Sequence, residues 1–276
     1  MIYLKTIFSA PNEIKYLKLN LREASNYIDK MIICEFNRTH TGQPRNLIFK
    51  NYLNNFSEQE KSKIIYIGAD LSDQTKLAIN DSKTAHKNER LMRGYFVKEV
   101  PLQNNDIIFS VDADEIIYKQ FYNPIIKALQ NAKWPWQTKS WLLPLQQFFY
   151  KINYLWENLI IDYGPVACRA EYFLKKYPAQ WRGKGKKFKS LVGAHFSWCL
   201  TTEEMITKLH SYAHNQDYGH LANKDILEDA IKNKTYPFDP SVNFKIKILD
   251  LKIDKKYFPA SLYNMLDDFK NLIAKE

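Results

Sequence analysis

The chain has 276 residues, of which 45% are hydrophobic and 14% aromatic, and its 40 Lys and Arg outweigh 30 Asp and Glu to give a formal net charge of +10. A composition this apolar, with only 8 glycines, is typical of a packed globular protein and excludes a disordered or low-complexity chain. The excess positive charge is typical either of a protein that binds phosphates or an anionic membrane, or of a solubilising Lys-rich surface. The lack of an RNP motif or zinc module predicts no nucleic-acid partner.

Strands and helices alternate through the first 117 residues. Apolar runs predict strands at 2–8, 30–36, 64–67 and 107–111. Apolar spacing and a Pro-Asn-Glu start predict helices at 11–24, near 47–56 and around 89–93. The alternation favours a parallel, nucleotide-binding type of sheet and therefore an α/β fold.

The pattern changes after this point. The segments 141–156 and 188–200 are aromatic and partly alternating, as antiparallel strands would be. Thr-Thr-Glu-Glu at 201–204 is a capping box that predicts a helix through about residue 216. A last amphipathic helix over 262–273 is expected to pack against the body of the domain, with membrane contact as the lesser alternative.

The three cysteines, Cys34, Cys168 and Cys199, are widely spaced and match no metal-site spacing. This pattern is typical of buried thiols in a reducing compartment. The N-terminal apolar run is too short for a signal peptide, and no stretch approaches the length of a membrane span. We therefore expect a cytoplasmic protein, with peripheral contact to an anionic membrane as a further option.

The acidic run at 112–115 carries the most chemical information. The buried strand predicted at 107–111 ends in Asp112, Asp114 and Glu115, at the edge where open α/β sheets hold ligands. Both aspartates can reach one ion if the chain turns at the small Ala113. Their hard oxygens suit Mg²⁺ or Mn²⁺, which keep open positions for a diphosphate. A solvated acidic loop is the alternative, and the apolar sequence on both sides counts against it.

Three motifs together resemble a known family. They are Asp-Ala-Asp-Glu-Ile at 112–116, Gly-Ala-His-Phe-Ser-Trp-Cys at 193–199 and Lys-Leu-His-Ser at 208–211. In this order they resemble glycosyltransferase family 17, which includes the enzymes that add the bisecting N-acetylglucosamine to N-glycans. The similarity runs from about residue 2 to 240.

Other positions look like that family's further landmarks. Glu35 followed by Thr-His-Thr-Gly at 39–42, and Glu89 with Arg93, stand in the same order ahead of the acidic strand. We expect the chain to differ from the animal members of the family in lacking their membrane anchor, and Ile117 stands where a proline is usual in the family. An unanchored cytoplasmic protein is not expected to meet mature N-glycans, so we expect a glycan or lipid-linked saccharide acceptor.

The resemblance implies a GT-A type of fold, with a Rossmann-like mixed sheet flanked by helices. It also implies an inverting transferase, similar to the β-1,4-N-acetylglucosaminyltransferases, that takes its sugar from a UDP-sugar with the help of Mn²⁺ or Mg²⁺. We expect one catalytic domain over 1–276. Its parts would be a nucleotide-sugar-binding half at 1–117, an acceptor-binding half at 118–240 and a C-terminal extension at 241–276.

The resemblance also suggests roles around the donor. Asp112 and Asp114 would hold the metal, with Asp114 as the direct ligand and Asp112 reaching the ion or the ribose. His195 would be a third ligand of the metal or the diphosphate, and a satisfied polar group is the alternative. Arg93 would pair with a donor phosphate, unless its partner is Glu89 one helical turn earlier.

Further candidates for the nucleotide and acceptor are Glu35 and two histidines. Glu35 would meet the base or ribose, or else cap the loop at 39–42. His210 and His214 are four residues apart, a spacing that can bind zinc, but no third ligand lies near them in sequence. We predict donor or acceptor contacts for His214 and a surface position for His210.

An inverting transferase needs a general base that takes the proton of the acceptor hydroxyl. Glu203, Glu204, Asp217 and Asp162 are candidates, and Glu203 is preferred because it follows the motif at 193–199. Its position at a helix N-terminus weakens it as a base. Glu115 would contact the acceptor or orient the acidic loop.

A second class of function is a nucleotide-sugar or glycan-binding protein on the same fold that no longer turns over. The intact pair of aspartates at 112 and 114 counts against this loss of activity. A nucleic-acid-binding protein would rest on net charge alone, and would show a steep salt dependence of binding.

Overall fold

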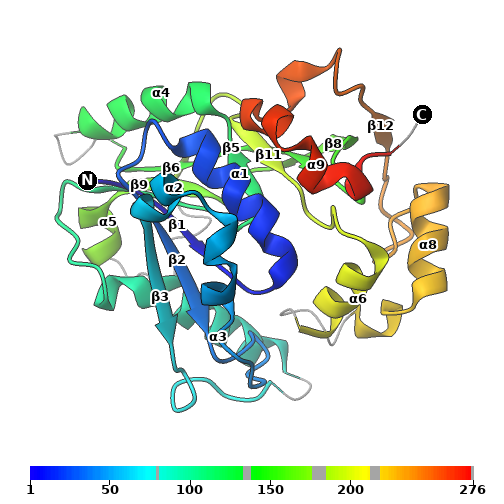
Figure 1. Ribbon diagram of the computed structural model, residues 1–276, viewed down its shortest axis with the longest axis horizontal. Helices are drawn as coiled ribbons and strands as arrows, with labels where there is room; N and C mark the ends of the chain where they lie inside the picture. Colours follow the sequence, from blue (N-terminus) through cyan, green and yellow to red (C-terminus); the bar gives the residue numbers. More distant parts are fainter. Residues whose placement is uncertain (79–80, 133–137, 176–184, 212–217, 275–276) are drawn as a thin grey trace.

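The computed structural model describes residues 1–78, 81–132, 138–175, 185–211 and 218–274 (Figure 1). Within these residues two sheets form the centre of the molecule. The first has the order β10-β6-β9-β4-β1-β2-β3. Its strands are β1 (Ile2–Ile7), β2 (Lys30–Phe36), β3 (Ile64–Ala69), β4 (Ile107–Ser110), β6 (Ser140–Leu142), β9 (Val166–Arg169) and β10 (Lys186–Lys187).

The second sheet has the order β12-β8-β7-β11-β5. Its strands are β5 (Glu115–Ile117), β7 (Leu145–Phe148), β8 (Tyr154–Ile161), β11 (Gly193–His195) and β12 (Ile246–Ile248). The described α-helices are α1 (Ile14–Ala24), α2 (Glu58–Lys63), α3 (Ser82–Gly94), α4 (Lys119–Gln130), α5 (Ala170–Lys175), α6 (Thr202–Ser211), α8 (Lys224–Asn233) and α9 (Leu266–Phe269).

The parallel sheet predicted for the first half is confirmed. Strands β3, β2, β1 and β4 lie side by side and run parallel, so their carboxyl ends share one edge. Strand β9 then pairs antiparallel to both β4 and β6. The sheet is therefore mixed, and it joins strands from both halves of the chain on either side of residue 117. This is the α/β class with a Rossmann-like mixed sheet that the sequence predicted.

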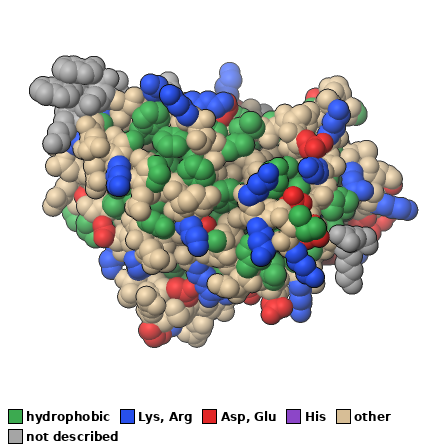
Figure 2. Space-filling model, turned by 90° about the horizontal axis from the view of Figure 1, so that it is seen from above, with side chains coloured by type: hydrophobic (Ala, Val, Ile, Leu, Met, Phe, Trp, Pro, Cys, Tyr) green, Lys and Arg blue, Asp and Glu red, His purple; other side chains and the backbone are tan. Residues whose placement is uncertain are grey.

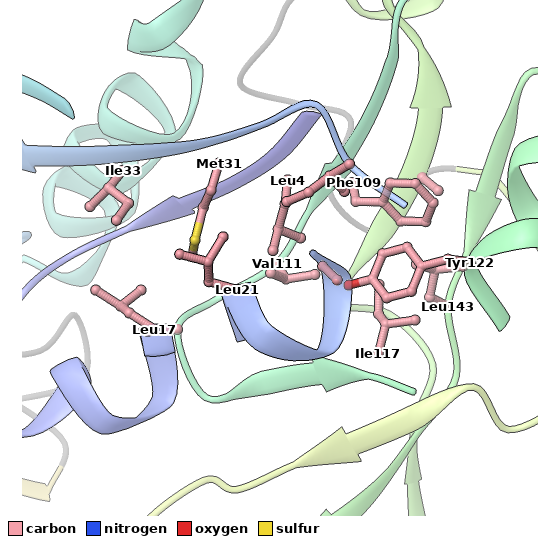
Figure 3. Packing of buried hydrophobic residues seen from close by; sticks show 14 of the residues in the cluster. Leu4, Leu17, Leu21, Met31, Ile33, Phe109, Val111, Ile117, Tyr122 and Leu143 are labelled. Atoms are coloured by element: carbon pink, nitrogen blue, oxygen red, sulfur yellow. The ribbon is translucent and has the colours of Figure 1, made fainter. Parts of the chain in front are cut away.

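Helices cover both faces of this sheet, as a parallel sheet requires. On one face Leu4 and Phe109 of the sheet pack with Leu17 and Leu21 of α1 and with Tyr122 of α4, as Figure 3 shows. On the other face α3 and the 3-10 helix η3 (Tyr95–Lys98) pack against β1 and β2. Successive residues of β1 thus point to opposite cores, which fixes the register of the strand.

The structure differs from the predicted elements in three places. The segment near 47–56 is a 3-10 helix, η2 (Phe49–Asn55), rather than an α-helix. Only Gly193–His195 of the segment 188–200 is a strand. The predicted C-terminal helix at 262–273 is instead the short α9 between η6 (Ala260–Asn264) and η7 (Lys270–Leu272). Its apolar side chains, including Leu262 and Phe269, are buried in the body of the protein, which confirms the packing role.

The basic residues are distributed over the surface. Figure 2 shows Lys and Arg side chains spread across one face among apolar and uncharged ones. None of the described helices combines the length and the hydropathy needed to cross a lipid bilayer. On this face the positive charge is therefore dispersed rather than gathered in one basic stripe.

Candidate active site

The acidic run forms a tight turn between β4 and β5, at the carboxyl edge of the parallel strands. The Glu115 N–H donates to the Asp112 carbonyl at 3.1 Å, and the Asp114 carbonyl accepts from the Phe196 N–H at 2.8 Å. The Asn20 side chain of α1 donates to the Ala113 carbonyl at 2.9 Å. The turn predicted at the small Ala113 is therefore present, and α1 and the segment after β11 both hold it.

Glu115 helps to orient this turn. Its side chain is buried, and its carboxylate accepts the Asp112 N–H at 2.6 Å. Its backbone lies in β5, opposite His195 in the antiparallel pairing with β11. Of the two roles predicted for Glu115, the structure supports the orientation of the acidic loop.

Asp112 is held by Arg93, which reaches it from α3. The guanidinium donates to both carboxylate oxygens, at 2.6 and 3.1 Å. The same Arg93 pairs with Glu89 at 2.8 Å, one helical turn earlier, as the sequence spacing predicted. Burial lowers the pKa of Arg93, but Asp112 and then Glu89 outweigh it and raise the pKa above its usual value. The carboxylates of Asp112 and Glu89 thus share the guanidinium of Arg93 as their cationic partner.

Asp114 faces His195 and the ammonium group of Lys208. Its Oδ1 lies 3.5 Å from His195 Nε2, and its Oδ2 lies 3.6 Å from Lys208 Nζ. Burial raises the pKa of Asp114, but Lys208 and then His195 outweigh burial and lower the pKa to about 2. Asp114 is therefore ionised at any ordinary pH, as a metal ligand must be.

A neighbouring glutamine fixes the His195 ring. Gln147 Nε2 donates to the Phe148 carbonyl at 2.7 Å, which leaves Gln147 Oε1 to accept from His195 Nδ1 at 2.9 Å. With Nδ1 protonated, the lone pair of the neutral ring is on Nε2 and points toward Asp114. Burial lowers the pKa of His195, but Asp114 outweighs burial and the pKa is raised.

Close backbone packing at Gly193 explains why the motif at 193–199 begins with a glycine. A Cβ on Gly193 would lie 2.0 Å from the Ile116 carbonyl oxygen. Strand β11 therefore approaches β5 at a distance that only glycine allows. This close approach is what brings His195 beside the turn that carries Asp114.

A divalent cation fits Asp114 and His195 as two protein ligands. Their two acceptor atoms converge, the tautomer of His195 is fixed by Gln147, and Mg²⁺-type sites commonly use one or two protein ligands plus phosphate oxygens and water. Asp112 does not fit as a direct ligand, because Arg93 engages both of its oxygens. Among the described residues, no group of three His, Cys, Asp or Glu is placed to hold a metal.

Glu35 has a structural role instead of the predicted nucleotide contact. It is fully buried at the end of β2, and its carboxylate accepts from the Ile48 N–H at 2.7 Å and the Phe49 N–H at 3.0 Å. The Tyr66 hydroxyl donates to it at 2.7 Å. These bonds close the start of η2, so the carboxylate caps residues 48 and 49 rather than the loop at 39–42.

The three candidate bases that the structure describes have partners outside the acidic turn. Glu203 is 71% exposed and lies 3.5 Å from Lys224. The hydrogen bond from its own backbone N–H is the largest influence on the pKa of Glu203 and lowers it, which weakens this carboxylate as a base. Asp162 pairs with Lys187 at 2.6 Å. Glu204 completes the predicted capping box with Thr201.

Two predicted site residues, His214 and Asp217, lie outside the described residues, so their roles stay predictions. His210 is exposed, as predicted. The residues that sequence reasoning missed are Lys208, Gln147 and Asn20, each of which contacts the acidic turn or His195. Lys208 opens the motif at 208–211, and that was the available signal.

Glu13, at the start of α1, gives a prediction about stability. Burial raises the pKa of Glu13 to about 7, although the Ser9 N–H lowers it and Asp114 raises it further. Because the pKa of Glu13 is higher in the folded protein than in the unfolded chain, its protonated carboxyl stabilises the fold below pH 4.5. That contribution is lost as the pH rises through 7. Glu13→Gln should therefore raise the unfolding free energy at pH 8 by up to about 3 kcal/mol.

The measurement is urea unfolding of the wild type and of Glu13→Gln at pH 8 and pH 5, where the gain should shrink. Glu58→Gln is the matched control, because that side chain is 89% exposed. A gain that stays constant or grows as the pH falls would contradict the assignment.

Comparison with known proteins agrees with these observations. The profile of glycosyltransferase family 17 matches residues 2–236, and curated proteins give no match. A solved 4-diphosphocytidyl-2C-methyl-D-erythritol synthase is 12% identical, with 62% of this chain and 75% of that chain covered and a TM-score of 0.34. Galactosyltransferase LgtC, in complex with donor and acceptor sugar analogues, is 8% identical, with 63% of this chain and 59% of that chain covered and a TM-score of 0.35.

A putative nucleotide-diphospho-sugar transferase from Desulfovibrio desulfuricans is also 8% identical, with 84% of this chain and 95% of that chain covered and a TM-score of 0.37. The mixed sheet and the acidic turn at its carboxyl edge have the GT-A type of arrangement that the resemblance implied. Because the family profile matches far more than half of its residues, the chain belongs to glycosyltransferase family 17.

Proposed function

We propose that the chain is a metal-dependent inverting glycosyltransferase that moves N-acetylglucosamine from UDP-N-acetylglucosamine to a hydroxyl of a glycan or lipid-linked saccharide. Membership of family 17 supports the reaction class. The observation that carries the metal dependence is the convergence of Asp114 Oδ1 and His195 Nε2 at 3.5 Å, at the carboxyl edge of the parallel strands.

The residues of the turn have distinct tasks in this mechanism. A bound divalent cation would neutralise the leaving diphosphate as a Lewis acid. Asp114 and His195 would hold that cation, and the contact of Gln147 with His195 Nδ1 would keep Nε2 free to meet it. Glu115 and Asn20 fix the turn, so that the ligands are in place before the donor arrives.

A hollow beyond the carboxyl ends of β1 and β2 suits the nucleotide. It has a volume of about 480 Å³ and is lined in part by Asn37, Arg38 and Arg45. Arg45 donates to the carbonyls of Phe8 and Phe36, beyond the ends of β1 and β2. Strand β1 is the neighbour of β4, so the hollow and the acidic turn share the carboxyl edge of the sheet. The positive charges of Arg38 and Arg45 there would attract the phosphates of a nucleotide.

Calorimetry with UDP and with a panel of UDP-sugars tests the proposal. UDP should bind at least about tenfold more weakly in EDTA than with Mn²⁺, because its diphosphate would then meet the Asp114 carboxylate without a neutralising ion. UDP-N-acetylglucosamine should bind more tightly than the other sugars. Equal affinity for UDP in EDTA and in Mn²⁺ would remove the metal from the proposal.

A donor-hydrolysis assay then separates an enzyme from a binding protein on the same fold. Release of free sugar from UDP-N-acetylglucosamine, dependent on Mn²⁺, is expected from the enzyme. Tight donor binding without any release, with or without saccharide acceptors, would favour the non-catalytic alternative.

A further inference from the structure

Lys208 lies at the centre of the candidate site, although the reaction outlined above gives it no task. It comes from α6, and its Nζ is 3.6 Å from Asp114 Oδ2. The same Nζ lies 5.0 Å from the centre of the Trp198 ring. Asp114 therefore has His195 on one oxygen and an ammonium group on the other, in the region where a metal ion would approach.

The helix that carries Lys208 is firmly placed. The Tyr16 hydroxyl of α1 donates to the Cys199 carbonyl at 2.6 Å, and Lys15 of α1 lies 3.5 Å from Glu204 of α6. Figure 1 shows α6 beside the start of α1. The turn before α6 contains Trp198 with a φ of 59°, an uncommon conformation for a bulky residue. Such a conformation persists only when its surroundings hold it.

The ammonium group, in contrast, can move. Lys208 is partly exposed and has a long flexible side chain, and its contacts include an ion pair at 3.6 Å and one aromatic face. An ammonium and a divalent cation repel each other at such short range, and both are attracted by the Asp114 carboxylate. A diphosphate would attract both cations at once, because it adds several negative charges beside the turn.

We propose that Lys208 holds Asp114 in the unloaded protein, opposes the binding of a bare divalent cation there, and transfers to the diphosphate of the donor, so that cation and donor bind together. This inference rests on the proposed function of the site. It assigns to Lys208 the recognition of a nucleoside diphosphate, and it makes Asp114 fully available to the cation only when that diphosphate is present.

Lys208→Met is the test, because methionine keeps an apolar side chain over Trp198 and removes the charge. The affinity for Mn²⁺ alone is measured by electron paramagnetic resonance, and that for UDP with saturating Mn²⁺ by calorimetry. The variant should bind Mn²⁺ alone about 5- to 10-fold more tightly and UDP about 10-fold more weakly than the wild type. Two changes of opposite sign are not expected from a lysine that only supports the fold.

Two variants serve as controls. Lys224→Met removes an exposed lysine whose partner is Glu203, on the same helix as Lys208, rather than Asp114, and both affinities should stay at the wild-type value. Lys208→Arg keeps the positive charge, so its affinity for Mn²⁺ alone should stay at the wild-type value. Circular dichroism confirms that each variant is folded.

The outcomes separate this inference from the proposed function. Unchanged affinity for Mn²⁺ alone in Lys208→Met, or a fall in both affinities, overturns the role of Lys208. If the wild type binds no UDP with Mn²⁺, the proposed function and the diphosphate step fail together. Tighter binding of Mn²⁺ alone in Lys208→Met would still show that the lysine opposes the cation.

Discussion

Replacing Asp114 with asparagine should lower glycosyl transfer by about 10³-fold or more while leaving the fold intact. Lewis-acid stabilisation by a metal contributes several kcal/mol to the transition state, and each 1.36 kcal/mol is about tenfold in rate. The amide of Asn has the shape of the carboxylate but lacks the charge that holds the cation. Because the pKa of Asp114 is lowered to about 2, the wild type is ionised throughout the assay range and the loss should not depend on pH.

Donor hydrolysis and circular dichroism separate the loss of chemistry from the loss of structure. Asp268→Asn is the matched control, because that aspartate pairs with Lys18 at 3.1 Å on another part of the surface. It should keep wild-type turnover. Full activity in Asp114→Asn would remove the central claim about this site.

The sequence predicts the first half of the fold well because its signals there are local. Strand β2 has the predicted bounds, Lys30–Phe36, and β1 differs by one residue at its end. Long apolar runs define buried parallel strands without reference to the rest of the chain. Strands β5 and β11, by contrast, have three residues each, and no periodicity can be read over three positions.

The partners of the site residues could not be read in the same way. The spacing of Glu89 and Arg93 predicts their ion pair, but the contact of Arg93 with Asp112 spans 19 residues and depends on how α3 packs beside β4. The resemblance suggested that Glu35 meets the base or ribose, and a buried charge at a strand end is costly. The fold neutralises that cost with the Ile48 and Phe49 N–H groups, which only tertiary structure brings together.

The same limit applies to Lys208. The capping box at 201–204 predicts where α6 begins, and the structure confirms it. The direction of α6 depends on contacts of α1 with the 196–204 segment, which join residues far apart in sequence. The motif at 208–211 marks Lys208 but does not reveal its partner. That partner is Asp114, 94 residues earlier in the sequence, and only the tertiary structure brings the two together.

Arg93 supports the site through stability, and its replacement gives the second large expected effect. Its guanidinium is 12% exposed and is the shared partner of Asp112 and Glu89. Removing one member of a buried ion-pair network costs about 3–5 kcal/mol, because the remaining charges are left uncompensated. Arg93→Met should therefore lower the free energy of unfolding at pH 7 by about this amount. Arg22→Met, which breaks the more exposed pair with Glu60, should cost about 0–1 kcal/mol.

The pH dependence of Arg93→Met identifies the cause. Burial raises the pKa of Glu89, but Arg93 and then His40 outweigh burial and lower it to about 2. Because the pKa of Glu89 is lower in the folded protein than in the unfolded chain, the ionised carboxylate stabilises the fold above pH 4.5. That contribution is lost as the pH falls toward 2. The cost of Arg93→Met in urea unfolding should therefore be greatest at pH 7 and smaller at pH 4, where Glu89 begins to be protonated without its partner. A cost that is equal at both pH values would mean that Arg93 stabilises the protein by packing alone, and that Asp112 does not depend on its charge.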